Sequence, residues 1–148
     1  MLLVVHESDL PKGRGFAPLQ WGVLEGKNEI TACLLDVNEE VDTGQIYDKV
    51  TASLDGTELY DELRDKQAEI TFRLINRFLE NRDGHNPLKQ VGTPTYYRKR
   101  NPEDSRLDID KTIRQQFNLL RVCNNEGWPA FFELYGQTYI IKIHKKVE

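Results

Sequence analysis

The chain has 148 residues, of which 39% are hydrophobic and 30% charged, and its formal net charge is -4. This composition is typical of one soluble globular domain and excludes collagen-like, mucin-like and extensively disordered proteins. No apolar run approaches the roughly 20 residues that cross a bilayer, and the acidic balance argues against a general nucleic-acid binder. The two cysteines have neither metal-site nor disulfide spacing, so we expect a cytoplasmic protein without a metal, a membrane or a nucleic acid as partner.

The first fifty residues alternate strand and helix signals. Residues 2–6 form an apolar run that ends in His6, which is typical of a strand buried on both faces of a parallel sheet. A glycine-rich loop follows, and Pro18 fits the first turn of a short helix. Residues 29–36 and 45–50 indicate two further strands that are joined by a polar turn.

The remainder begins with the strongest helix signal. Apolar residues recur at three- and four-residue spacing over residues 57–81, and charged residues occupy the opposite face. Residues 83–108 are rich in Gly, Pro and charge, which indicates a long connection. A second helix is predicted over 110–124 with Asp110 as its N-cap, and a β-hairpin over 131–144. The inner face of this second helix is predicted to carry Ile113, Phe117, Leu120 and Val122.

One ordered set of polar residues carries the chemical signal. His6 follows the C-terminal end of a strand, where ligands bind in open α/β sheets, and Asp42 lies on a later Asp-Thr-Gly turn that can return to it. We predict that these two residues are catalytic, and that Ser8, Arg14 and Gly15 in the intervening loop bind substrate. The alternatives are a hydrogen-bonded strand-end histidine, an ordinary turn aspartate and a solvated arginine.

A second candidate site mixes aromatic and cationic side chains. Tyr96, Tyr97 and Arg98 can stack on a base and hold a diphosphate, because aromatic rings and guanidinium groups suit those contacts. The alternative is a surface strand whose tyrosines pack on the core. Core positions or a dimer interface are expected for the later aromatic residues Trp128, Phe131, Phe132 and Tyr139.

The ordered motif resembles the 10-formyltetrahydrofolate-dependent formyltransferases. The signature of that family is Asn-x-His, then Ser-x-Leu-Pro, an Arg-Gly, a Pro and later an Asp-Thr-Gly. The matching residues here are His6, Ser8, Leu10, Pro11, Arg14, Gly15, Pro18, Asp42, Thr43 and Gly44. The form Glu-Ser-Asp-Leu-Pro-Lys-Gly and the stretch over 100–108 look most like enzymes that formylate dTDP-linked 4-amino-4,6-dideoxy sugars.

This resemblance implies 10-formyltetrahydrofolate as cofactor and a nucleotide-linked amino sugar as substrate, in a branch that serves bacterial lipopolysaccharide and related surface polysaccharides. His6 would take the proton that the attacking amine loses, and Asp42 would stabilise the protonated imidazole. The position of the family's Asn is Val4, which cannot donate a hydrogen bond. Two other interpretations are a methionyl-tRNA formyltransferase-like enzyme and an inactive remnant that binds a sugar nucleotide or dimerises.

The register of the motif also predicts the organisation of the chain. The fold class implied is α/β: the later part of a Rossmann-like formyltransferase sheet, then a long helix, a connection, a second helix and a C-terminal β-hairpin. Met1 stands where the family is still in mid-sheet, so we expect a chain that lacks the N-terminal half. Residues 1–82 would belong to the catalytic core, and residues 83–148 would serve sugar-nucleotide contacts or dimerisation. An open sheet edge favours association, so a homodimer is expected.

Overall fold

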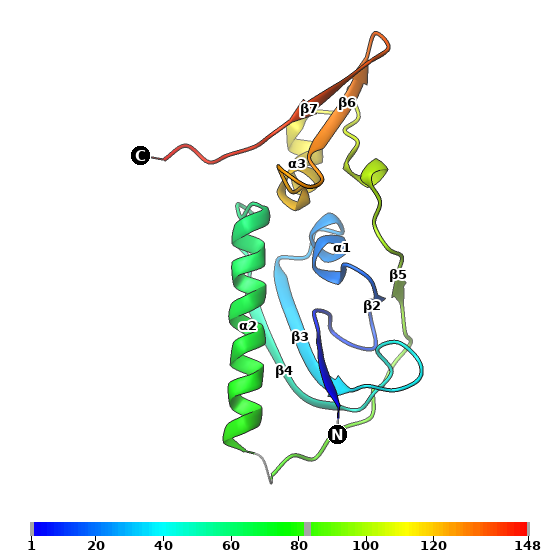
Figure 1. The fold of residues 1–148 in the computed structure, drawn as a ribbon, viewed down its shortest axis with the longest axis vertical. Coiled ribbons are helices and arrows are strands. Elements are labelled where there is room, and N and C mark those ends of the chain that lie inside the picture. Colours follow the sequence, from blue (N-terminus) through cyan, green and yellow to red (C-terminus); the bar gives the residue numbers. More distant parts are fainter. Residues whose placement is uncertain (1, 82–83, 148) are drawn as a thin grey trace.

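The computed structural model describes residues 2–81 and 84–147. Its central layer is a three-stranded sheet in the order β1–β3–β4, in which both neighbouring pairs are antiparallel. The strands are β1 (Leu3–His6), β3 (Glu29–Asp36) and β4 (Ile46–Ser53). The long helix α2, Tyr60–Glu80, runs along one face of this sheet (Figure 1). The opposite face is therefore the one left for loops.

The two faces of the sheet differ because successive side chains of a strand alternate between them. Leu3 and Val5 pack with the apolar cluster that includes Ile70 of α2. Val4 and His6 point to the opposite face, where His6 is buried and Val4 is 40% exposed. The end of β1 thus presents a histidine on the side of the sheet that faces away from α2.

The prediction of a strand buried on both faces of a parallel sheet is wrong for β1. Its neighbour β3 runs antiparallel, with His6 opposite Cys33 and Leu3 opposite Asp36. Val4 is 40% exposed, so the face of β1 that carries it is not buried. Only the face toward α2, with Leu3 and Val5, packs against an apolar cluster. A continuous apolar run indicates a strand, but it does not report the direction of the neighbouring strand.

The long predicted helix is confirmed, although it begins at Tyr60 rather than Thr57. Thr57 donates its backbone N–H and its hydroxyl to Asp55, which forms a turn before the helix. The carboxylate of Glu62 accepts from the N–H of Leu59 and satisfies one donor at the helix end. Within the two described ranges, no helix combines the length and apolar character needed to cross a membrane.

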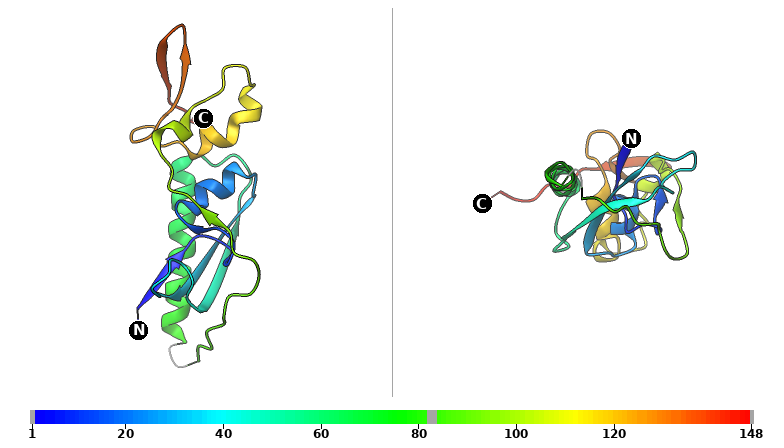
Figure 2. Two further views of the ribbon diagram at one scale, coloured as in Figure 1. Left: turned by 90° about the vertical axis from the view of Figure 1, so that its right-hand side faces the viewer. Right: turned by 90° about the horizontal axis from the view of Figure 1, so that it is seen from below.

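Shorter elements link this sheet to the C-terminal part of the chain. The helix α1 (Pro18–Leu24) begins with its proline, as predicted. A two-residue strand β2 (Arg14–Gly15) pairs in parallel with β5 (Tyr96–Tyr97), so the long connection lies beside the glycine-rich loop (Figure 1). The elements that follow are the 3-10 helix η1 (Pro102–Ser105), α3 (Ile113–Val122), β6 (Ala130–Leu134) and β7 (Gln137–Ile141). The predicted hairpin is confirmed as β6–β7, which extends away from the sheet (Figure 2).

The second predicted helix begins later than expected. Its N-cap is Thr112, whose hydroxyl accepts from the N–H of Gln115, whereas Asp110 donates its own N–H to the side chain of Asp108. This local turn competes with helix formation at the predicted start. Ile113, expected inside, is 71% exposed, because the buried residues of α3 all lie in its last turn.

Candidate active site

The predicted pair of His6 and Asp42 lies at the C-terminal end of β1. Nδ1 of His6 is 3.4 Å from Oδ2 of Asp42, and the two side chains are 8% and 11% exposed. Asp42 belongs to the loop between β3 and β4. Because Asp36 lies opposite Leu3, at the far end of β1, this loop folds back along the sheet to reach His6. A largely buried imidazole therefore faces a carboxylate.

Backbone groups of the glycine-rich loop hold both partners. The second ring nitrogen of His6, Nε2, is 2.8 Å from the carbonyl oxygen of Gly13. Since a carbonyl only accepts, this nitrogen carries a proton. Oδ2 of Asp42 accepts a hydrogen bond of 2.8 Å from the N–H of Gly15. One loop thus orients the imidazole and the carboxylate together.

Two glycines permit the close approaches that build this site. Gly15 has a φ of 97°, and a Cβ there would lie 2.4 Å from the carbonyl oxygen of Tyr97. A Cβ on Gly44 would lie 1.9 Å from the carbonyl oxygen of Asp36. Asp42 itself has a φ of 57°, a left-handed conformation that Asp tolerates better than most residues. The turn therefore depends on the residue types that the Asp-Thr-Gly motif specifies.

Arg14 and Tyr96, both predicted to bind substrate, contact each other. Nη1 of Arg14 donates to the hydroxyl of Tyr96 at 3.0 Å, and its guanidinium carbon is 5.8 Å from the ring centroid. Arg14 also donates to the side chain of Gln90. The ring of Tyr96 is 63% exposed. Arg14 thus holds Tyr96 beside the glycine-rich loop, with the tyrosine open to solvent.

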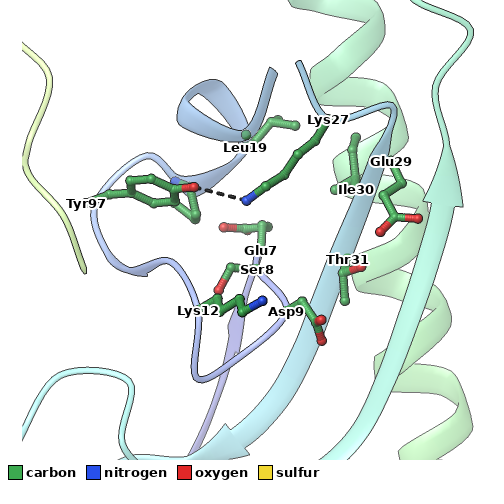
Figure 3. Close-up of a pocket in the computed structure, with 12 residues that line it drawn as sticks. Glu7, Ser8, Asp9, Lys12, Leu19, Lys27, Glu29, Ile30, Thr31 and Tyr97 are labelled. Atoms are coloured by element: carbon green, nitrogen blue, oxygen red, sulfur yellow. Dashed lines mark hydrogen bonds between the residues drawn. The ribbon is translucent and has the colours of Figure 1, made fainter. Parts of the chain in front are cut away.

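Tyr97 borders a small cavity of about 180 Å³ beside the glycine-rich loop (Figure 3). Its hydroxyl donates to Glu25 at 2.6 Å and accepts from Nζ of Lys27 at 3.1 Å. Burial raises the pKa of Tyr97, and the bond to Glu25 raises it further, so the phenol stays protonated. Ser8 lines the same cavity, and its buried hydroxyl has no hydrogen-bond partner in the described part of the chain.

Arg98 is engaged within the chain. Its guanidinium carbon lies 4.9 Å from the centroid of the Trp21 ring, and both terminal nitrogens donate to the carboxylate of Asp104. The hydrogen bond from Arg98 lowers the pKa of Asp104 to about 2. The guanidinium that was predicted to hold a diphosphate is therefore already paired with a carboxylate.

A larger cavity, of about 550 Å³, escaped sequence reasoning. It lies among α1, the first residue of α2 and the connection from α3 to β6. Its walls include Phe16 and Trp128, which are 55% and 40% exposed, and the cations Lys99 and Arg100. Nε of Arg100 is buried without a partner among residues 2–81 and 84–147. The one local signal was Phe16, which directly follows the motif glycine.

Cys33 lies opposite His6 on the neighbouring strand, but it does not add a nucleophile. Burial raises the pKa of its thiol, and Sγ donates to the carbonyl oxygen of Ser8. A buried, protonated thiol is unreactive. Among the described residues, no group of three or more His, Cys, Asp or Glu side chains is arranged to hold a metal ion. The one contact between a buried imidazole and a carboxylate described at this site is that of His6 with Asp42.

Comparison with known proteins identifies the family. Residues 1–78 match the family model described as formyl transferase. The chain belongs to the formyl transferase family. A methionyl-tRNA formyltransferase of Francisella philomiragia is 32% identical over 136 residues, which cover 91% of this chain and 43% of that protein. The chain spans less than half the length of the curated relatives that it matches.

Solved structures confirm the predicted α/β formyltransferase fold. The methionyl-tRNA formyltransferase from Clostridium thermocellum has a TM-score of 0.80 at 28% identity, with 98% of this chain and 63% of that chain covered. The N-formyltransferase from Helicobacter canadensis, in complex with folinic acid and dTDP-3-aminofucose, has a TM-score of 0.74 at 18% identity. That likeness covers 91% of this chain and 51% of the other, and it concerns the fold.

Proposed function

We propose that this protein is an N-formyltransferase that moves a formyl group from 10-formyltetrahydrofolate to the amine of a nucleotide-linked amino sugar. The observation that carries the proposal is the 3.4 Å approach of Nδ1 of His6 to Oδ2 of Asp42. The family match over residues 1–78 supports the reaction type. We assign the reaction to the cytoplasm and its product to bacterial surface polysaccharide, lipopolysaccharide included.

His6 is proposed as the general base. An amine attacks as the free base and loses a proton as its nitrogen bonds to the formyl carbon, and histidine suits that transfer near neutral pH. With Nε2 holding its proton against Gly13, Nδ1 is the nitrogen that accepts. The proton taken up then lies between the imidazole and the carboxylate of Asp42, whose negative charge stabilises the imidazolium.

Two exposed valines are near neighbours of this pair in the chain, and their apolar side chains suit contact with a heteroaromatic ring. Val4 shares a face of β1 with His6 and is 40% exposed, and Val41 precedes Asp42 and is 60% exposed. Apolar walls with a few placed polar groups are typical of cofactor sites. We propose that these valines hold the pteridine ring of the folate. The bound folate supplies the activated formyl group.

The larger cavity supports a nucleotide as the carrier of the acceptor amine. Phe16 and Trp128 offer rings on which a base can stack, and Lys99 and Arg100 offer positive charge for a diphosphate. Phe16 directly follows Gly15, whose N–H binds Asp42, so this wall of the cavity is covalently continuous with the catalytic loop. We propose this cavity as the nucleotide site, with Arg14 and Tyr96 nearer the reacting groups.

The test is formyl transfer measured by mass spectrometry with dTDP-4-amino-4,6-dideoxyglucose as acceptor. Trp128→Ala is expected to raise KM for the nucleotide sugar about tenfold with kcat unchanged, since stacking on a base contributes about 1–3 kcal/mol. The matched control is Tyr135→Asn at the hairpin turn, where the tyrosine is 91% exposed and asparagine suits its φ of 50°. Equal KM values in both variants would exclude the cavity as the nucleotide site.

A second candidate acceptor is methionyl-tRNA. Relatives from Francisella philomiragia and Rickettsia massiliae that are 32% identical to this chain are methionyl-tRNA formyltransferases. The same assay with methionyl-tRNA decides between the acceptors, because only one of them should give a formylated product. Binding of dTDP-sugar without transfer of formyl to either acceptor would favour the third interpretation, an inactive sugar-nucleotide binder.

We also propose a division of labour and a dimer. Residues 1–82 would carry the chemistry, and residues 83–148 the acceptor contacts and the dimer interface. Exposed apolar side chains on the hairpin support this, since Tyr139 and Ile140 are 45% and 65% exposed. Sedimentation at micromolar concentration should give twice the chain mass, and a stable monomer would contradict the dimer.

A further inference from the structure

Gln90 joins the turn that carries Asp42 to the glycine-rich loop that holds both members of the proposed catalytic pair. It lies half-buried in the segment between α2 and β5. Its Nε2 donates to the carbonyl oxygens of Asp42 and Gly44, at 2.7 and 2.9 Å. Its Oε1 accepts from Nη2 and Nε of Arg14, at 2.7 and 3.2 Å. A primary amide has two N–H donors and two acceptor lone pairs, so every one of its hydrogen bonds is used.

The turn that Gln90 holds includes an unfavourable backbone conformation. Asp42 has a left-handed backbone with a φ of 57°, a conformation that most residues with a Cβ avoid. The carboxylate of Asp42 meets the loop through the N–H of Gly15, and Gln90 connects the same turn to Arg14, the preceding residue. The turn is therefore attached to the glycine-rich loop at two adjacent positions, one through Asp42 and one through Gln90.

The geometry points to Gln90 as the positioning residue that keeps the Asp42 carboxylate facing Nδ1 of His6. Gln90 acts through the backbone of the Asp-Thr-Gly turn and does not contact the imidazole. The positioning role of Gln90 is inferred from the hydrogen bonds above. The effect of Gln90 on the reaction rate rests on the proposed formyl transfer. Because the His6–Asp42 contact is 3.4 Å long, a small displacement of the turn weakens it.

The test reads the His6 ring directly by NMR. The chain has three histidines, so ¹⁵N-histidine labelling gives three imidazoles, His6, His85 and His144, that single substitutions assign. Asp42→Asn defines how the His6 Nδ1 resonance moves when the carboxylate is lost. Gln90→Glu keeps acceptors for Arg14 but removes both donors to the turn. Val91→Ala is the control, because Val91 is adjacent and 88% exposed.

In Gln90→Glu, the His6 Nδ1 resonance is expected to move in the same direction as in Asp42→Asn and by most of that change. Val91→Ala should leave it in place. A His6 resonance that stays at its native position in folded Gln90→Glu, or in Asp42→Asn, overturns the proposal. Gln90→Ala, which removes the acceptor as well as both donors, serves as a second variant and should move the resonance in the same direction. Thermal melts identify any variant that has unfolded.

The rate provides a separate readout. Gln90→Glu should lower kcat for formyl transfer about tenfold and leave KM for the acceptor unchanged, because displacement of a catalytic group acts on the chemical step. If the native protein transfers no formyl group while the NMR shifts appear as expected, the proposed function fails and the positioning role stands. If formyl transfer by Gln90→Glu is as fast as in the native protein, the proposed effect of Gln90 on catalysis is refuted.

Discussion

Two buried pairs of ionisable side chains, Glu58–Arg121 and His6–Asp42, differ in how fully their hydrogen bonds are used. Arg121 is 1% exposed and donates to the carbonyl and the carboxylate of Glu58, at 2.9 and 3.0 Å, and to Asn118 at 2.9 Å. The carboxylate of Glu58 also accepts from two backbone N–H groups. Asp42, by contrast, uses only Oδ2 toward the described residues, for Gly15 and His6.

This difference supports a structural role for Glu58–Arg121 and the proposed reactive role for His6–Asp42. A buried charge is tolerated when hydrogen bonds surround it, and Glu58–Arg121 meets that condition where α3 packs against the start of α2. Burial would raise the pKa of Glu58, but the backbone N–H groups that bind it lower the pKa below its usual value. In His6–Asp42, Oδ1 of Asp42 accepts no hydrogen bond from the described residues. A site that transfers protons needs such a free acceptor.

The largest effect on stability is expected from Arg121→Met. Arg121→Met removes the buried cation beside the Glu58 carboxylate and leaves Lys66, whose Nζ is 3.4 Å from Oε1 of Glu58. Breaking a buried ion pair typically costs about 3–5 kcal/mol of unfolding free energy, and the remaining contact with Lys66 places the expected loss at the lower end of that range. Urea unfolding measures the loss, and the double variant Glu58→Gln with Arg121→Met should recover part of it. A single variant as stable as the native protein would contradict the structural role of this pair.

For the reactive pair the expected loss is in rate rather than in stability. His6→Gln keeps a donor for the Gly13 carbonyl but accepts no proton, so kcat for formyl transfer should fall about 10²–10⁴-fold. The free energy of unfolding should change by no more than about 1 kcal/mol. His144→Gln, at an exposed site, is the matched control. Native rates in His6→Gln would remove this residue from the mechanism.

A gain of activity would test whether a further hydrogen-bond donor fits beside His6 on its face of β1. Val4→Asn places an amide on the face of β1 that His6 occupies, at the position where the resembling family has Asn. Donors to a developing oxyanion contribute about 10²–10³-fold where they are well placed, and we expect about a tenfold gain in kcat. Val4→Ala, which adds no donor, should show no gain; an equal gain there would point to a steric cause.

The third ion pair, Arg98–Asp104, should have the smallest effect, and that effect is on the stability of the fold at low pH. The hydrogen bond from Arg98 lowers the pKa of Asp104 from 3.8 to about 2, so this carboxylate stabilises the fold above its ordinary pKa and loses that contribution as pH falls from 3.8 towards 2. The melting temperature should fall across that window. In Asp104→Asn the fall should be smaller; an unchanged fall would assign the effect to other carboxylates.

The sequence predicted what local pattern encodes. The ordered motif placed His6 and Asp42 in one family-specific arrangement, and apolar spacing predicted α2 and the C-terminal hairpin. The predicted start of α3 was wrong because Asp108 and Thr112 both offer side-chain acceptors to nearby N–H groups, those of Asp110 and Gln115. Apolar spacing does not show which of these polar residues begins the helix. The predicted parallel pairing of β1 was wrong. The direction of pairing depends on the partner strand, which an apolar run does not specify.

The parts of the site that escaped prediction join distant segments. The larger cavity brings Phe16 together with Tyr60, Arg100 and Trp128, and no spacing rule relates those positions. Gln90 is a single amide in a connection rich in Pro and Gly, without a periodic pattern around it. Its importance becomes visible only when its four hydrogen bonds are seen together.

The parallel pairing of β2 with β5 has a consequence for how the site is assembled during synthesis. Arg14 and Tyr96 meet although they are 82 positions apart, and contacts of such separation form late because a long loop has to close first. A nascent chain that has reached residue 82 already contains His6 and Asp42, yet it lacks Gln90 and β5. Completion of the glycine-rich loop therefore waits for a stretch of chain beyond the family match over residues 1–78, a stretch in which the sequence marks Tyr96 and Tyr97 but not Gln90.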